Sequence, residues 1–392
     1  MKKIILLSMA TSTLLLHAGD VKALEKRVAS LEEALEVSQK RIDKEKIDEA
    51  MTSKNNSFNQ KAFIPDISLI LNASAVSRII KNSTYEGYGI DGFVDKIDEI
   101  PVNKNRGFNL NYAEFGMHSA VGPYFDADAI FHLSPDSFEI EEAYITTKKM
   151  PYNVQVKAGT FKSGFGRINA IHQHAQHFVV QPLVYEAMFG VEGIKDPGIS
   201  VNWVAPTDTY IMLGAEVQQG SNELSFGESD SLLYVGYIKG GFDLGDYTTA
   251  LWGTSIAKGK TDTDKDSTVY GVDFTLKQTI DSYSSVTWQS EYLHRDRDNV
   301  KQAGFYTQLL YDLNSNWEVG ARYDALTKNS LTHTDDLKKY STIVAYKPFE
   351  FTKLRLQYTF DDSKSFQNER KEIHEFSLEY VVEIGAHGAH AF

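Results

Sequence analysis

Three histidines lie within six residues of one another in the segment 162–197: His172, His174 and His177. Imidazole nitrogens are ligands for zinc, copper and nickel, so the trio predicts a site for zinc or another divalent metal. An extended stretch would place His172 and His174 on one side, and a following turn could bring His177 round to them. The carboxylates that could supply a fourth ligand are Glu186, Glu192 and Asp196. The alternative is a polar loop whose histidines form hydrogen bonds or act as pH-sensitive gates.

Other motifs predict little chemistry. His387 and His390, in the C-terminal GAHGAHAF, form a weaker pair that we expect far from the trio. Gly164-Phe-Gly166 lacks the third glycine and the strand–helix context of a nucleotide-binding loop. No Ser-His-Asp order and no paired catalytic carboxylates stand out, so we expect no catalytic residues and no enzyme activity.

The elements that position the histidines follow a period of two, which is the repeat of a β-strand. In 353–361, for example, Leu354, Leu356 and Tyr358 share one face, whereas Arg355 and Gln357 share the other. The pattern recurs from about residue 65 to the end. The sixteen candidate strands are 66–78, 107–120, 123–133, 138–149, 153–161, 198–205, 209–220, 231–243, 247–258, 267–279, 284–295, 300–312, 316–326, 338–347, 352–362 and 373–384.

Connections between these strands alternate between short turns and longer loops, the latter including 79–106, 162–197 and 363–372. This alternation is typical of an outer-membrane barrel, with short periplasmic turns and longer external loops. The strands are also longer than the usual five or six residues. We therefore predict an all-β fold, a transmembrane antiparallel β-barrel of about 16 strands over residues 65–392. The alternative is a soluble β-sandwich or β-solenoid, since a sandwich shows the same alternation.

A barrel of this size encloses a lumen that strand side chains cannot fill, so water or a folded element must occupy it. The long segment 162–197 combines apolar residues with charges, and we expect it to fold inward and narrow the pore. The charged residues assigned to the constriction are Lys162, Arg167, Glu186 and Glu192. On the clearest strands, inward carboxylates outnumber inward cations, which favours cations at the wall.

The N-terminus predicts export and assembly. Residues 1–18 read as a signal peptide, with Lys2 and Lys3 before a short apolar run; a membrane anchor is the alternative. Residues 19–48 carry a heptad seam, which predicts a coiled-coil oligomerisation helix, and 49–64 read as a polar linker. The seam consists of Val21, Leu24, Val28, Leu31, Leu35 and Ile42. A lone amphipathic helix is the alternative for this segment.

Composition supports an exported barrel. The chain of 392 residues has no cysteine, which excludes a disulfide framework and thiolate metal sites. Aspartate and glutamate number 53 against 40 lysines and arginines, so the net charge is -13 and nucleic acid is not an expected partner. Phe392 ends the chain, as an aromatic residue commonly ends outer-membrane proteins.

The chain resembles Gram-negative outer-membrane porins, in particular the phosphate-selective porin O/P-like group. That resemblance implies a signal peptide, a short coiled coil and a sixteen-stranded trimeric barrel. The loop from FGRIN (165–169) to DPG (196–198), followed by NWVAPTD (202–208), is similar to barrels called zinc-regulated outer-membrane proteins. This second likeness implies a role in metal uptake. Phosphate selectivity requires a ladder of inward cations, whereas this wall is acidic.

Three functions follow as hypotheses. The first is a homotrimeric channel in the outer membrane of a Gram-negative cell, surrounded by lipid, that passes small hydrophilic solutes or ions, divalent metals among them. The second is a closed barrel that acts as a receptor for a metal or a partner. The third is a barrel enzyme.

Overall fold

The computed structural model describes residues 65–97, 100–134, 137–227, 231–332, 336–367 and 369–385. The predicted signal peptide 1–18, coiled-coil helix 19–48 and linker 49–64 lie outside these residues, as do His387, His390 and Phe392. In the described ranges, no helix is long and apolar enough to cross a membrane.

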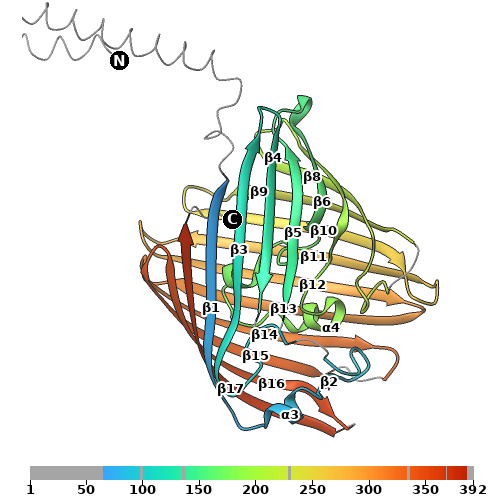
Figure 1. Ribbon diagram of the computed structural model, residues 1–392, viewed down its shortest axis with the longest axis vertical. Coiled ribbons are helices and arrows are strands. Elements are labelled where there is room, and N and C mark those ends of the chain that lie inside the picture. Colours follow the sequence, from blue (N-terminus) through green and yellow to red (C-terminus); the bar gives the residue numbers. More distant parts are fainter. Residues whose placement is uncertain are drawn as a thin grey trace, which may run out of the picture. The chain divides into compact units, whose positions relative to one another are not determined.

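The described part of the chain is built almost entirely of strands (Figure 1). The strands are β1 (Asp66–Arg78), β2 (Gly89–Ile90), β3 (Gly107–Val121), β4 (Phe125–Leu133), β5 (Phe138–Thr147), β6 (Val154–Lys162), β7 (Lys195–Val204), β8 (Tyr210–Gln218), β9 (Leu233–Asp243), β10 (Thr248–Lys260), β11 (Asp266–Thr279), β12 (Ser285–Arg297), β13 (Val300–Asp312), β14 (Trp317–Asn329), β15 (Leu337–Phe349), β16 (Thr352–Phe366) and β17 (Glu369–Gly385). The short helices are α3 (Asn82–Tyr85), η2 (Pro151–Asn153), η3 (Gln173–Ala175) and α4 (Leu183–Phe189).

Hydrogen bonding closes the sheet into a ring. Consecutive strands from β3 to β17 pair antiparallel, and β1 pairs with both β3 and β17. In the described sheet of 17 strands, the two-residue β2 pairs with β16 alone, so the other sixteen form the barrel. Each of the sixteen predicted strands overlaps one of them. The predicted antiparallel barrel is confirmed.

The predicted connection 363–372 is wrong. Strand β16 continues to Phe366 and β17 begins at Glu369, with Lys364 opposite Lys371 and Ser365 opposite Arg370. The two strands run on past the apolar stretch, where the side chains are polar apart from Phe366. Such a segment has no alternation, which is why it read as a loop.

The barrel is apolar outside and polar inside. On β16 and β17, Leu356 and Phe376 are half exposed on the outer face, whereas Arg355, Gln357 and Glu379 are buried on the inner face. A soluble protein would bury the first set and expose the second. The exposed aromatic residues at the short-turn end are Tyr124, Tyr152, Tyr247, Tyr283, Trp317, Phe349 and Phe351. An aromatic girdle of this kind marks a membrane interface, so the fold is that of an outer-membrane barrel.

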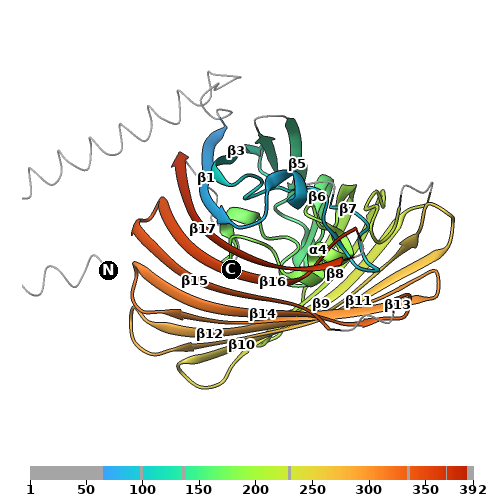
Figure 2. The same ribbon diagram turned by 90° about the horizontal axis from the view of Figure 1, so that it is seen from below.

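Part of the lumen holds a hydrophobic cluster instead of water. Helix α4 lies within the ring of strands (Figure 2) and contributes Leu183, Val184, Met188 and Phe189 to this cluster. The wall residues that pack against it come from the long-loop ends of β9 to β15, Leu233, Val235, Leu293, Leu326 and Leu337 among them. At this end of the barrel, folded chain therefore occupies part of the lumen.

Candidate functional site

The connection between β6 and β7, residues 163–194, turns into the lumen at its first residues. The Ser163 hydroxyl donates to Glu216 Oε2 at 2.5 Å, and the amide of Gly164 donates to Glu216 Oε1 at 3.0 Å. Gly166 has a φ of 62°, and a Cβ there would lie 2.1 Å from Glu291 Oε1, so only glycine fits. Phe165 is buried in the lumen cluster. These contacts fix the entry of the connection, which we call the inner loop.

Helix α4 of the inner loop is held by polar contacts as well as by apolar packing. The amide of Leu183 donates to Asp324 Oδ1 at 3.0 Å, which satisfies one donor at the helix start. The Glu186 carboxylate accepts from Lys339 Nζ at 3.2 Å and also pairs with Lys364. Burial raises the pKa of Glu186, but the two ammonium groups outweigh it and lower this pKa to about 2. Glu186 is therefore a charged anchor to β15 and β16.

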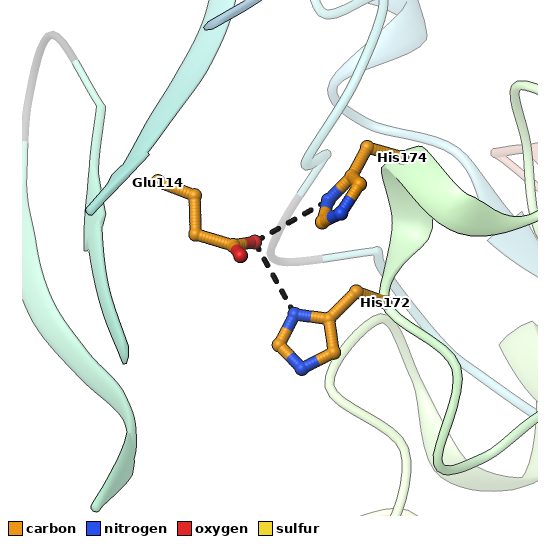
Figure 3. Close-up of side chains that lie close together, drawn as sticks. All are labelled: Glu114, His172 and His174. Atoms are coloured by element: carbon orange, nitrogen blue, oxygen red, sulfur yellow. Dashed lines mark hydrogen bonds and ion pairs between the residues drawn. The ribbon is translucent and has the colours of Figure 1, made fainter. Parts of the chain in front are cut away.

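The opposite side of the inner loop meets the wall through histidine and carboxylate side chains (Figure 3). Glu114 Oε2, on β3, lies 3.2 Å from His172 Nδ1 and 3.4 Å from His174 Nδ1. All three side chains are buried, and their candidate ligand atoms lie within 4.8 Å of one another. Nε2 of His172 lies 2.7 Å from Glu142 Oε1. Two of the predicted metal ligands are thus together, joined by a glutamate that the sequence did not single out.

A β-bulge explains why two consecutive carboxylates face this cluster. Adjacent residues on a strand normally point to opposite faces. On β5, however, Ile130 of β4 pairs with Glu142 and Phe131 pairs with Ile140, which leaves Glu141 as the extra residue. Both Glu141 and Glu142 are consequently buried toward the inner loop. Glu141 lies 3.6 Å from His172 Nδ1 and accepts from Lys162 Nζ at 2.9 Å.

The two histidines have different protonation behaviour. Burial lowers the pKa of His172, but the carboxylates of Glu141 and Glu114 raise it more, to about 10. Burial lowers the pKa of His174, and its hydrogen bond to Glu114 only partly opposes this. In the absence of metal, His172 is therefore an imidazolium between carboxylates, and the attachment is ionic.

The structure does not bring His177 to the other two histidines. Helix η3 ends at Ala175 and Gln176 is extended, so the chain moves away from the cluster. His177 Nδ1 lies 3.0 Å from Glu318 Oε1 on β14, and its side chain is 44% exposed. The candidate fourth ligands are elsewhere too: Glu186 binds Lys339 and Lys364, Glu192 pairs with Lys195, and Asp196 accepts from Gly220 and Ser221.

The four residues assigned to the constriction fall into different surroundings. Lys162 is the last residue of β6, is partly buried and pairs with Glu141, and Glu186 and Glu192 pair with lysines as above. Arg167 differs, because it borders a cavity of about 550 Å³ toward the short-turn end of the barrel. Lys239 of β9 and Asp273 of β11 line the same cavity. Arg167 thus lies where the inner loop meets the open part of the lumen.

Sequence reasoning missed Glu114, Glu141 and Glu142. Glu114 lies 58 residues before His172 in the chain, so no local motif links them. The one available signal was the pair Glu141-Glu142 within an apolar strand, since two consecutive charges interrupt the alternation and suggest a bulge.

Comparisons with known proteins agree with this fold. No family model matches the chain. The outer membrane channel DcaP of Acinetobacter baumannii has a TM-score of 0.55 at 13% identity, over 82% of this chain and 97% of that one. OmpT of Vibrio cholerae, solved in a trimer form, has a TM-score of 0.53 at 12% identity, over 82% and 99%. At these identities the likeness establishes the barrel fold of porins.

A much closer sequence relative is an uncharacterized protein of Aquifex aeolicus. It is 38% identical in an alignment of 389 positions that covers 86% of this chain and 81% of the relative. An identity of this level over most of both chains indicates common descent. The chain therefore belongs to the same family as the A. aeolicus protein.

Proposed function

We propose that the chain is a porin of the outer membrane, a passive channel for small hydrophilic solutes or ions. The observation that carries this proposal is the closed sixteen-stranded ring, apolar outside and polar inside, with a cavity of about 550 Å³ below the inner loop. Sixteen strands leave more room than their own side chains can fill. The inner loop narrows this space, and Arg167 lies at the narrowed region.

The charge of the inner surface supports a preference for cations. In the described residues, the buried carboxylates are Glu114, Glu141, Glu142, Asp196, Glu216, Asp273, Glu291, Glu318, Asp324, Asp361, Glu375 and Glu379. The buried lysines and arginines are half as many: Arg78, Arg295, Arg322, Lys339, Arg355 and Lys364. An excess of carboxylates lowers the free energy of a cation in the lumen. Divalent metal ions are accordingly among the solutes that we propose, and phosphate is not.

The remaining organisation is proposed on the same basis. Residues 1–18 direct export and 19–48 form a coiled coil that holds three barrels together. The trimer form of V. cholerae OmpT, which shares the fold, supports a homotrimer. The long loops face outward and the short turns face the periplasm, as in other outer-membrane barrels.

Single-channel recording tests the proposal. The full-length protein, purified in detergent with its heat-modifiable gel mobility confirmed, is added to a planar lipid bilayer. We expect stepwise ohmic conductance in KCl and a reversal potential in a salt gradient that indicates cation preference. If folded protein inserts into the bilayer but conducts at no voltage, the proposed channel function is wrong, although the barrel fold still stands.

A closed receptor is the second candidate, and one observation favours it. The hydrophobic cluster around α4 occupies part of the lumen at the long-loop end, where a solute would enter. A receptor would show no conductance in the wild type, and conductance only after residues 168–190 are replaced by a short Gly-Ser linker. A channel would conduct before this replacement as well as after it.

A further inference from the structure

We propose that Glu114, His172 and His174 bind one divalent transition-metal ion of the zinc type, with Glu141 as the fourth ligand. The ion would join the inner loop to the barrel wall, because Glu114 and Glu141 belong to β3 and β5. The inference does not depend on the passage of solutes. It concerns an ion that stays bound, and a protein that conducts nothing could still hold it.

The distances between the candidate ligand atoms fit such an ion. Zinc bonds to nitrogen or oxygen are about 2.0–2.1 Å, so neighbouring ligands of a tetrahedral site are about 3.3 Å apart. Glu114 Oε2 lies 3.2 Å from His172 Nδ1 and 3.4 Å from His174 Nδ1. Glu141 Oε2 lies 3.6 Å from His172 Nδ1. These three spacings are close to those of a tetrahedral site, and Glu114, His172 and His174 already lie within 4.8 Å of one another.

Glu141 is suited to the fourth position because its two oxygens have different surroundings. Oε1 binds Lys162 Nζ at 2.9 Å, whereas Oε2 is buried and accepts no hydrogen bond. A buried carboxylate oxygen without a hydrogen bond is costly unless a positive charge approaches it. In the metal-free protein the His172 imidazolium lies 3.6 Å from this oxygen, and a metal ion between Glu114 and a neutral His172 would approach it more closely.

Glu142 contacts the ring nitrogen of His172 that does not face the proposed ion. Metal-binding histidines commonly give the second ring nitrogen to a carboxylate, which fixes the ring and strengthens the ligand. Nε2 of His172 lies 2.7 Å from Glu142 Oε1, which leaves Nδ1 directed toward Glu114. The charges also balance, since the three glutamates exceed the single Lys162 by two negative charges, and a divalent ion with neutral imidazoles cancels them.

The donor set selects the class of metal. Two imidazoles with two carboxylates suit zinc, cobalt or nickel, whereas magnesium and calcium prefer oxygen ligands alone. The chain contains no cysteine, so thiolates cannot compete for the ion. We therefore expect zinc to bind and magnesium to leave the site empty.

The test measures zinc binding to the full-length protein in detergent. The protein carries a tag without histidine, His387 and His390 are replaced by alanine, and EDTA followed by dialysis removes bound metal. We expect one zinc ion per chain by calorimetry, no heat from magnesium, and a visible spectrum of tetrahedral cobalt when Co²⁺ replaces zinc. Glu114→Gln and His174→Gln should each weaken zinc binding by about 100-fold or more, and Glu142→Gln by about 10–100-fold.

His177→Ala is the matched control, since His177 lies on the same loop but pairs with Glu318. We expect its zinc affinity to equal that of the wild type. Absence of zinc binding by folded wild-type protein would overturn the proposal. The proposal would also be overturned if His177→Ala lost as much zinc affinity as Glu114→Gln. If Glu114→Gln does not fold, the cobalt spectrum of the wild type and the zinc affinity of Glu142→Gln still test the proposed site. Channel recordings in EDTA test the proposed function separately.

Discussion

The inner loop is attached to the barrel in two different ways. Helix α4 buries apolar side chains against β9 to β15 and adds the Glu186 anchor, whereas residues 172–174 meet β3 and β5 through histidines and carboxylates. Apolar packing does not change with the ions in solution, whereas a cluster of imidazoles and carboxylates does. With respect to metal ions, the same loop thus has one permanent end, at α4, and one end that can respond, at residues 172–174. Four experiments test this difference.

The largest effect should follow from loss of the permanent end. Phe189 packs against Phe165 and Tyr185, with ring centroids 5.5 and 5.6 Å away. Phe189→Ala leaves a cavity in the lumen cluster and should destabilise the inner loop by about 3–5 kcal/mol. We expect noisier and severalfold larger single-channel conductance. Phe376→Ala, on the lipid-facing surface, is the control and should leave conductance unchanged.

The second-largest effect should follow from loss of the Glu186 anchor. Glu186→Gln removes the carboxylate that pairs with the buried Lys339 and leaves Lys364 only the more distant Asp361, 3.9 Å away, at a cost of about 3–5 kcal/mol. Because the folded pKa of Glu186 is lowered from 4.5 to about 2, its contribution is complete above pH 4.5 and is lost as the pH falls toward 2. Protease cleavage of the inner loop should therefore increase in the wild type only at low pH.

The matched variant for the anchor is Glu192→Gln. Glu192 pairs with Lys195, but its side chain is 41% exposed, so the cost should be about 0–1 kcal/mol. Equal protease sensitivity of the two variants would show that α4 is held by packing alone.

A smaller effect should follow at the responsive end. Lys353 Nζ donates to the carbonyl of His174 at 2.8 Å. Lys353→Met leaves that carbonyl without this donor and should loosen residues 172–177 by about 1–3 kcal/mol. Hydrogen exchange should become faster at these residues and stay unchanged in α4. Faster exchange along the whole inner loop would mean that the two ends are not separate. Lys301→Met, at an exposed position of β13, is the control.

The smallest effect concerns the cavity that neither end touches directly. Arg167 and Asp273 both line it. Arg167→Gln should shift the reversal potential toward greater cation preference, and Asp273→Asn should shift it the other way, with conductance changing by less than about twofold. Shifts of the same sign in both variants would place the selective region elsewhere.

The strands could be predicted from the sequence because alternation is a local property. The few residues around Leu356 and Gln357 are enough to assign the first to the outer face and the second to the inner face of the strand. The pairing of β16 with β17 beyond Asp361 could not be predicted in this way, because Ser363 and Lys364 are polar although they are buried, so the period disappears.

The candidate site was harder to predict for two physical reasons. The contact of Glu114 with His172 depends on how far the inner loop enters the lumen, which residues 163–194 alone do not determine. The direction of His177 depends on one extended residue, Gln176, after η3. Spacing in the sequence suggested three histidines together, but the chain is extended at Gln176 after η3 and His177 pairs with Glu318.

The bulge at Glu141 has a consequence for how such barrels diversify. Removing one codon at this position would restore strict alternation in β5, so that a single carboxylate instead of two would face the lumen. The outer surface and the strand number would stay the same. Relatives could therefore gain or lose the cluster through one insertion or deletion in a wall strand, with the histidines left untouched.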